Sequence, residues 1–582
     1  MFGIVVFVFW YVKYPHALAY QEQFQLFMSG TSYLNEMLAM PGGFARYVSE
    51  FLVQFNNVVM LGAVIMAILF VLMQVLTWLL MRSNRQAVSS SNGDMGVLAW
   101  YSLSFLPALS LWYTLGDESV LMAFVVSLLF CLLAMLCWPC CQDNGGRGAK
   151  TLRIVYAIVV VPVVYWLAGP LVWIFAAYAV LRLIIDGSSK GVDIVIGICL
   201  LLYTLACILL SARFVNFPLN RLMTGLCYYR FVLVFTMPMI VTAVLCLLVP
   251  LAMRFLPAIA KPKRAALAAM TLLVLTVVCA IVWIPRSYDV QKYDLIDYDY
   301  LVRMKDWKGI IAKAEQKTPD LPMSVSATNL ALAMTGQLGD RVFEFYQRGH
   351  EGLLPPFERN FTSAQVTGEI YFHLGLVNTA QRFAFESMEE LPDFRKSARS
   401  LKRLAETNLI NGQYEVARKY LQMLKRSMFY RSWAERMEAL LGHEKEINEH
   451  PVYGWLRKVQ LKEDFLFSED ETDKICGQLF LQNKDNLMAV QYLLMLPLLD
   501  RDINRFMHYA QVVQSLTNYK PRAVQEAIAF AYAQNQHEPP QGLVSPEVMQ
   551  AAREFLRATS GGAQTGMLEQ FRGTAWYYLF KN

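Results

Sequence analysis

The sequence predicts an all-α protein with two parts, a polytopic transmembrane helical bundle followed by a soluble α-solenoid. Three observations predict this fold class. Long apolar segments recur through residues 1–285, charged residues concentrate in residues 286–582, and the second part repeats a pattern of paired helices. Only 17% of the 582 residues are charged, against about 25% in a typical soluble protein. We therefore predict a transmembrane domain at 1–285 and a soluble domain at 286–582.

About nine apolar segments of the first domain are predicted to cross the membrane, because a span needs about 20 apolar residues. The first segment is short, since "MFGIVVFVFWYV" reaches only about 18 Å at 1.5 Å per residue. It lacks a basic n-region and a small-residue cleavage site, so we do not interpret it as a removable signal peptide. The predicted spans are residues 1–13, 57–81, 97–114, 119–138, 152–168, 170–185, 191–212, 231–253 and 265–285.

Lysine and arginine residues gather in four connections of the same parity, which predicts that these connections are cytoplasmic. The opposite connections are acidic or very short, such as "GDES" at 116–119. The N-terminus is then cytoplasmic. In the inner membrane of a Gram-negative bacterium, the opening loop and the domain after residue 286 are periplasmic. The residues that predict this orientation are Arg82, Arg85, Arg147, Lys150, Arg153, Lys190, Arg254, Lys261, Lys263 and Arg264.

One connection departs from this charge pattern. The stretch "RFVNFPLNRLMTGLCYYRF" at 213–231 is predicted to be periplasmic, yet it carries Arg213, Arg221 and Arg230 and no acidic residue. One interpretation is a miscounted span, or arginine side chains that extend to lipid headgroups. The functional interpretation is that these arginines bind an anionic group such as a lipid phosphate.

The opening loop, "YQEQFQLFMSGTSYLNEMLAMPGGFARYV" and the residues after it, predicts interfacial helices at 20–56. Apolar residues recur at steps of three and four on both sides of Pro41-Gly42-Gly43, where Pro ends a helix and Gly allows a tight turn. Two amphipathic helices joined by this turn are expected to lie in the membrane interface. Their polar faces are expected to present Glu22, Gln25, Glu36, Arg46 and Glu50.

This loop resembles the first external loop of the C-superfamily (GT-C) glycosyltransferases, which use polyprenyl-phosphate sugars. In that superfamily the loop forms one or two interfacial helices, and an acidic residue just after the first span serves as catalytic base or metal ligand. The matching position here is Glu22. The resemblance implies a polyprenyl-phosphate donor and a divalent metal. This sequence has Glu-Gln in place of an acidic pair, so we assign no residue as a metal ligand.

The second domain reads as consecutive helical pairs, with a Gly at the turn and small Ala where helices cross. These units resemble tetratricopeptide-like (TPR-like) repeats, which stack into an α-solenoid with a concave surface. The spacing is irregular and no unit matches the full consensus, so the repeats are degenerate. The predicted units lie at 306–319, 368–392, 401–424 and 486–510.

The whole chain resembles an uncharacterised family of Bacteroidetes multispan inner-membrane proteins with a C-terminal TPR-like domain. The stretches "NLALAMTGQLGDRVFEFYQRG" (329–349) and "NGQYEVARKYLQML" carry this resemblance. It implies an architecture and a location, but no activity.

Two functional hypotheses of different classes follow, and the sequence leaves both open. The first is a GT-C-like transferase at the periplasmic face, with Glu22 as catalytic residue, Arg213, Arg221 and Arg230 on the lipid phosphate, and the repeats engaging an acceptor. The second is a non-enzymatic, membrane-anchored scaffold for periplasmic proteins or peptides. A transporter fits less well, because the spans carry few charges. The basic residues lie between apolar spans, so we expect no nucleic-acid partner.

Overall fold

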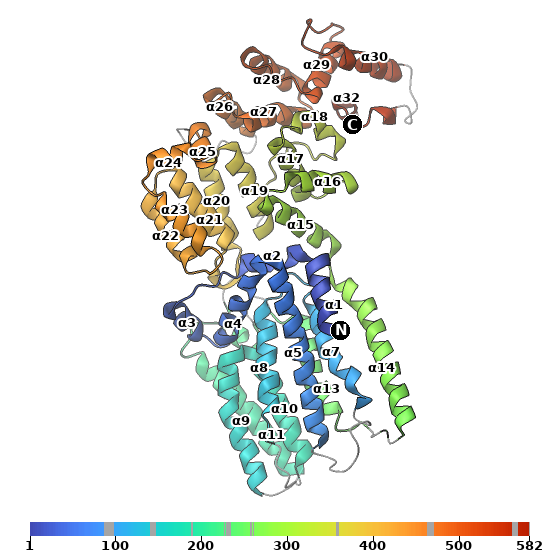
Figure 1. Cartoon of the computed structure of the whole chain (residues 1–582), viewed down its shortest axis with the longest axis vertical. Coiled ribbons are helices and arrows are strands. Elements are labelled where there is room, and N and C mark those ends of the chain that lie inside the picture. The colour runs from blue at the N-terminus through green and yellow to red at the C-terminus, as the bar shows by residue number, and fades with distance from the viewer. Residues whose placement is uncertain are drawn as a thin grey trace. The chain divides into compact units, whose positions relative to one another are not determined.

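The computed structural model describes residues 1–86, 98–139, 147–187, 190–225, 227–228, 234–256, 259, 261–356, 360–461, 471–560 and 568–580 (Figure 1). Within these residues the elements are helices, and the only β-pairing is two isolated bridges. The chain is therefore all-α, as predicted.

The chain divides into two compact units. The first unit comprises Met1–Tyr293, Leu391–Ala398 and Lys425–Arg431. The second unit comprises Asp294–Glu390, Arg399–Leu424 and Ser432–Asn582. Two short segments from late in the chain thus belong to the first unit, and we call Leu391–Ala398 and Lys425–Arg431 the return segments.

The first unit is built from helices whose lengths range from a single turn to nearly eight turns, the longest being the 28 residues of α5. The elements are α1 (Phe2–Val8), the π-helix η1 (Phe9–Lys13), α2 (Pro15–Phe24), α3 (Thr31–Leu38), α4 (Gly43–Val53), η2 (Gln54–Asn57), α5 (Val59–Gln86), η3 (Tyr101–Phe105), α7 (Leu106–Thr114), α8 (Met122–Leu136), α9 (Arg147–Ala168), η4 (Gly169–Leu171), α10 (Val172–Asp186), α11 (Lys190–Ser211), α12 (Leu219–Thr224), α13 (Met237–Ala252), α14 (Pro262–Trp283) and η5 (Ile284–Ser287).

Among the described residues, four stretches are long and apolar enough to cross a membrane: Val59–Arg85, Gly148–Asp186, Lys190–Ser211 and Lys263–Ser287. A fifth is added if Phe2–Lys13 and Pro15–Phe24, which meet at 84°, are counted as one bent span. The prediction of nine spans is therefore wrong.

Two features of the structure explain why the sequence predicted more spans than the structure has. The predicted spans 152–168 and 170–185 fall within the single stretch Gly148–Asp186, as α9 and α10 joined by η4. Three other predicted spans correspond to shorter helices, since α7 has 9 residues, α8 has 15 and α13 has 16. Even 16 residues reach only about 24 Å, which is less than the hydrocarbon core of about 30 Å.

The helix α8 shows why a short helix resembled a span in the sequence. It packs against α4, α5, α9 and α10 (Figure 1). As a result, 11 of its 15 residues are buried. A helix enclosed on all sides is apolar on all sides, so the sequence does not distinguish it from a membrane span.

The opening loop keeps the predicted turn but not the predicted orientation of its helices. The chain breaks between α2 and α3 at residues 25–30, so the first predicted amphipathic helix is two helices. Of the residues expected on exposed polar faces, Glu36 is exposed. The other expectations are wrong, because Glu22, Gln25, Arg46 and Glu50 are only 2%, 1%, 4% and 1% exposed.

The turn at Gly42 and Gly43 accepts no side chain. Gly42 has φ +72°, and a Cβ there would lie 3.1 Å from the backbone of Gly169. The Gly42 N–H also donates to the Trp166 carbonyl at 2.8 Å. A Cβ at Gly43 would lie only 1.7 Å from the Met37 carbonyl oxygen. The contact between α3 and α4 therefore requires glycine at this point.

The second unit consists of helices that pair with their neighbours in sequence. Contacts join α16 to α17, α19 to α20, α24 to α25, and α27 to both α26 and α28. The elements are α15 (Val290–Met304, which begins in the first unit), α16 (Trp307–Gln316), α17 (Pro322–Met334), α18 (Leu338–Arg341), η6 (Val342–Glu344), α19 (Phe361–Leu374), α20 (Val377–Glu389), η7 (Pro392–Phe394, within a return segment), α21 (Ala398–Ile410), α22 (Tyr414–Lys425), α23 (Arg431–Ala439), α24 (Glu444–Glu449), α25 (Tyr453–Val459), α26 (Thr472–Gln482), α27 (Leu487–Leu499), α28 (Ile503–Leu516), α29 (Arg522–Gln534), α30 (Pro546–Ser560), η9 (Glu569–Phe571) and α32 (Ala575–Phe580).

Side-chain caps begin several of these helices. Asp306, Asn360, Asn486 and Asp502 each accept a hydrogen bond from the backbone N–H three residues later. Such caps satisfy backbone donors that have no partner within the helix. The helices that they begin are α16, α19, α27 and α28.

We expect Gly43→Ala to lower the melting temperature of the detergent-solubilised chain. The new methyl group would overlap the Met37 carbonyl oxygen, and such overpacking costs about 1–3 kcal/mol. Gly191→Ala is the matched control in the same unit, because a Cβ at this helical glycine meets no atom within 4 Å. Alanine there should be neutral or stabilising, by up to about 1 kcal/mol. Equal melting temperatures for the two variants would contradict this account of the turn.

Candidate functional site

The return segments form hydrogen bonds with the opening loop inside the first unit. Ser29 donates its backbone N–H and its hydroxyl to the Arg426 carbonyl, each at 2.8 Å. Arg426 in turn donates from Nε to the Ser29 carbonyl and from Nη2 to the Ser32 hydroxyl, both at 3.0 Å. The Leu26 N–H donates to the Lys396 carbonyl at 3.2 Å. Both return segments are therefore held by the backbone of the opening loop.

An ion pair between Arg46 and Asp393 lies at the centre of this contact. Arg46 belongs to α4 and Asp393 to the first return segment, and their side chains are only 5% and 6% exposed. The second oxygen of Asp393 accepts the Tyr228 N–H at 2.9 Å. Burial alone would lower the pKa of Arg46, but Asp393 and other neighbours raise it above its ordinary value. Arg46 is therefore a stable cation in this position.

Glu50 is the second buried charged residue of α4. It accepts a hydrogen bond from the Tyr33 hydroxyl, and its Oε1 lies 3.7 Å from Nε of Arg395. Burial raises the pKa of Glu50 by more than Arg395, Tyr33 and Arg46 lower it. The three guanidinium nitrogens of Arg395 are buried without a hydrogen-bond acceptor among the described residues. We call Arg46, Glu50, Asp393 and Arg395 the opening-loop cluster.

Glu22, the predicted catalytic residue, is buried beside the second return segment. Its Oε1 accepts a hydrogen bond from the Tyr430 hydroxyl at 2.7 Å. The same Tyr430 oxygen accepts from Nδ2 of Asn57 at 3.0 Å. A carboxylate that is 2% exposed and hydrogen-bonded in this way holds the second return segment in place.

The structure describes two of the three predicted phosphate-binding arginines, Arg213 and Arg221. Arg213 lies exposed in the turn after α11. Arg221 is half-buried on α12, and its Nη1 donates to the Tyr228 carbonyl at 3.2 Å. Because the Tyr228 N–H binds Asp393, Arg221 lies next to the opening-loop cluster. Arg230 lies outside the described residues.

The GT-C resemblance implies a divalent metal, which would need several His, Cys, Asp or Glu side chains close together. In the part of the chain that the structure describes, no group of three or more His, Cys, Asp or Glu residues could hold a metal ion. The carboxylates of the opening-loop region bind protein donors, Tyr430 for Glu22 and Tyr33 for Glu50. The described residues therefore do not fit a metal centre at Glu22.

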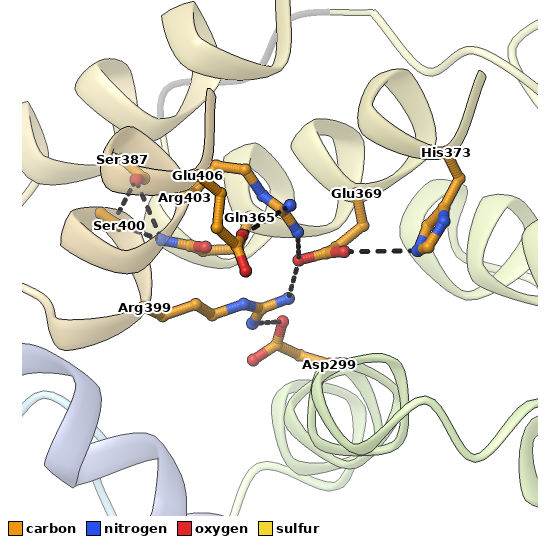
Figure 2. A network of polar contacts seen from close by, with 9 residues as sticks. All are labelled: Asp299, Gln365, Glu369, His373, Ser387, Arg399, Ser400, Arg403 and Glu406. Atoms are coloured by element: carbon orange, nitrogen blue, oxygen red, sulfur yellow. Dashed lines mark hydrogen bonds and ion pairs between the residues drawn. The ribbon is translucent and has the colours of Figure 1, made fainter. Parts of the chain in front are cut away.

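A second buried polar network lies inside the second unit (Figure 2). Arg403 donates to Glu369 at 2.6 Å and to Glu406 at 2.9 Å. Arg399 donates to Asp299 at 2.7 Å and lies 3.9 Å from Glu369. These contacts connect α15, α19 and α21, so the network stabilises the packing of three helices.

An amide–hydroxyl cluster extends the network on one side (Figure 2). Gln365 donates from Nε2 to the hydroxyls of Ser387 and Ser400, at 2.9 and 2.6 Å. The two hydroxyls are 2.8 Å apart and share a further hydrogen bond. This cluster joins α19 to α20 and α21.

The pKa values of the network do not favour proton transfer at neutral pH. Burial alone would raise the pKa of Glu369, but Arg403, Arg399 and His373 lower it to about 2. Burial lowers the pKa of His373 to about 4, against the influence of Glu369 at 3.7 Å. A general acid or base works best with a pKa near the operating pH. The network is therefore suited to a structural role.

Sequence reasoning missed the partners from the return segments. Asp393 and Arg395 lie in the connection "LPDFRKS" between α20 and α21, and Arg426 and Tyr430 lie between α22 and α23. Nothing in their spacing distinguishes them from other polar residues of helix connections. The sequence does offer a signal for a buried charged cluster in α4, because Arg46 and Glu50 are four residues apart and so lie on one face of the helix.

We expect the stability of the second unit to fall as the pH is lowered. The reason is that Glu369 and His373 each have a lower pKa in the folded chain than in the unfolded chain, so the folded chain binds fewer protons. Between about pH 6.5 and 4, the unfolded chain takes up a proton at His373 that the folded chain does not. The same holds for Glu369 between about pH 4.5 and 2. His373→Gln should remove the loss in the upper window, up to about 3 kcal/mol, in hydrogen exchange of α19 peptides. Exposed His537→Gln is the control. A His373→Gln profile identical to that of the parent would contradict the assignment.

Comparison with known proteins places the chain in a family without identifying an activity. No curated protein and no solved structure matches it. A family model described as a family of unknown function, DUF6057, matches residues 1–582. The match includes the opening loop and both return segments. The chain therefore belongs to the DUF6057 family.

Proposed function

We propose that this protein is a non-enzymatic, membrane-anchored scaffold whose second unit binds protein or peptide partners. The observation that carries the proposal is that three of the four charged residues of the opening loop, Glu22, Arg46 and Glu50, are buried and contact the return segments. Glu22 binds Tyr430, and Arg46 binds Asp393. Charges used in this way hold the fold together and are not presented to a substrate.

The second unit supplies the partner-binding surface in this proposal. Its sequential helix pairs stack as degenerate TPR-like repeats into an α-solenoid, and solenoids bind partners along extended surfaces. Large apolar residues are exposed on neighbouring pairs. Phe385 of α20 and Val416 of α22 are each 43% exposed, and the Phe385 ring lies 6.5 Å from the ring of Tyr420. Contiguous exposed apolar patches are typical of interaction sites, and in this proposal Phe385 and Val416 contribute to such a patch.

The location in this proposal is a bacterial inner membrane, with a cytoplasmic N-terminus and a periplasmic second unit. Its support is that basic residues from three of the four basic connections meet at one end of the first unit. Arg85 binds the Leu256 carbonyl, while Arg153 and Arg254 both pair with Asp186. Basic residues favour the cytoplasmic side. The chain then runs through α14 toward the opposite side.

A transferase that uses a lipid-phosphate donor, with the repeats engaging an acceptor, is the second candidate. One observation favours it. Arg395 is a buried guanidinium whose nitrogens have no hydrogen-bond acceptor in the part of the chain that the structure describes, and it lies beside Glu50, whose pKa is raised by burial. Shifted pKa values next to an available cation are typical of functional sites. In this candidate Glu50 replaces Glu22 as the reacting carboxylate.

The scaffold candidate predicts that Glu22→Gln destabilises the chain. If Glu22 holds Tyr430, then Glu22→Gln and Tyr430→Phe should each lower the free energy of unfolding by about 1–3 kcal/mol. The double variant should lose less than the sum, because both changes act on the same hydrogen bond: the glutamine of Glu22→Gln would accept it without a charge, and the phenylalanine of Tyr430→Phe would have no hydroxyl to donate it. Thermal unfolding of the full chain in detergent measures all three. Glu36→Gln is the control, since Glu36 is exposed in the same loop.

A Glu22→Gln variant as stable as the parent, or more stable, would count against the scaffold. In the transferase candidate Glu50 is the reacting carboxylate. Because catalytic residues usually cost stability, that candidate predicts a neutral or stabilising effect for Glu50→Gln.

The orientation is tested by topology reporters. A reporter at Gly148 should indicate the cytoplasm, and one after Asp289 should indicate the periplasm, because α14 separates the second position from the basic connections. The same compartment at both positions would exclude this orientation.

A further inference from the structure

The ends of five helices in the first unit meet around one carboxylate, Asp186. These ends belong to α5, α9, α10, α11 and α13, and we call this region the basic end. Asp186 is the last residue of α10 and its side chain is 4% exposed. It is also the boundary of the apolar stretch Gly148–Asp186. The basic end therefore lies where a membrane span gives way to the headgroup layer.

Three arginines converge on Asp186. Arg182 donates from Nε and Nη2 to Oδ2, at 3.1 and 2.9 Å. Arg153 Nη1 lies 3.5 Å from the same oxygen, and Arg254 Nη1 lies 2.5 Å from Oδ1. One carboxylate is thus shared by three guanidinium groups.

The neighbouring ion pair does not offset this excess of positive charge. Lys150 binds Asp193 at 2.5 Å, and a Cβ built on Gly187 would touch Asp193, so this pair lies next to the Asp186 contacts. Among the described residues, these contacts therefore bring together four cations, from three arginines and Lys150, but only two carboxylates, Asp186 and Asp193. Like charges at this separation repel one another by several kcal/mol where water is partly excluded, so an additional anion would stabilise the group.

Exposure differs among the cations of the basic end. Arg153 and Arg182 are buried, with side chains 8% and 1% exposed. Arg254 is 17% exposed and Lys150 is 34% exposed. A ligand that approaches from the membrane surface meets Arg254 and Lys150 first.

We propose that the basic end binds a phosphate group, with Arg254 and Arg153 as direct ligands and Lys150 at the rim. Arginine matches phosphate with two parallel N–H donors and remains charged in a partly buried site. Because the site lies at the boundary of a span, the phosphate group comes from the headgroup of an anionic phospholipid. This site is independent of the proposed scaffold function.

The test uses the full chain in detergent and native mass spectrometry. Phosphatidylglycerol should bind and raise the melting temperature, whereas phosphatidylcholine, whose phosphate is neutralised by choline, should do so at least about tenfold more weakly. Arg254→Gln should weaken phosphatidylglycerol binding about tenfold, the typical effect of losing a charge-assisted hydrogen bond. Lys190→Gln is the matched control, because Lys190 is exposed on α11 at the same end.

The remaining variants and probes distinguish the sources of phosphate. Arg254→Lys keeps the charge and should retain intermediate affinity, and it replaces Arg254→Gln if that variant fails to fold. Inorganic phosphate at millimolar concentration should leave the melting temperature unchanged. If it stabilises the chain as well as the lipid does, the lipid source is excluded. Equal lipid binding by the parent, Arg254→Gln and Arg153→Gln would exclude the site itself.

Discussion

A charge that is buried in a protein must be paired, and this requirement on α4 determines how the first unit is assembled. Arg46 and Glu50 lie on the buried face of a helix that the sequence places beside the membrane. Their ion-pair partners are not near them in sequence, since Arg46 and Asp393 are 347 residues apart. Leaving either charge unpaired would cost several kcal/mol. The return segments are therefore a necessary part of the first unit.

The same requirement explains the form of the opening loop. Glu22 is buried because Tyr430, 408 residues later, supplies its hydrogen bond. The turn at Gly42 and Gly43 brings α4 close to α3 and to the connection between α9 and α10, where only glycine fits. A loop that only joined two spans would need neither the buried charges nor the close turn. The loop is better described as a binding surface for the return segments.

The sequence predicts local structure better than it predicts pairing. Periodic apolar residues identified the helices, and Pro41-Gly42-Gly43 identified the turn, because both are properties of short stretches. The burial of Arg46 and Glu50 depends on "LPDFRKS", a helix connection without periodicity, so the sequence suggested exposed polar faces. The excess of predicted spans has a similar origin. The helix α8 is apolar all round because four helices of the unit surround it, and composition does not distinguish that environment from lipid.

The central claim is that the return segments are integral to the first unit, and hydrogen–deuterium exchange of the full chain in lipid nanodiscs tests it most directly. The amides of Leu26 and Ser29 bond to the return segments. We predict that these amides and peptides covering 391–398 and 425–431 exchange as slowly as peptides from α4. Rapid exchange of both return segments, at the rate of exposed connections such as that before α22, would contradict the account.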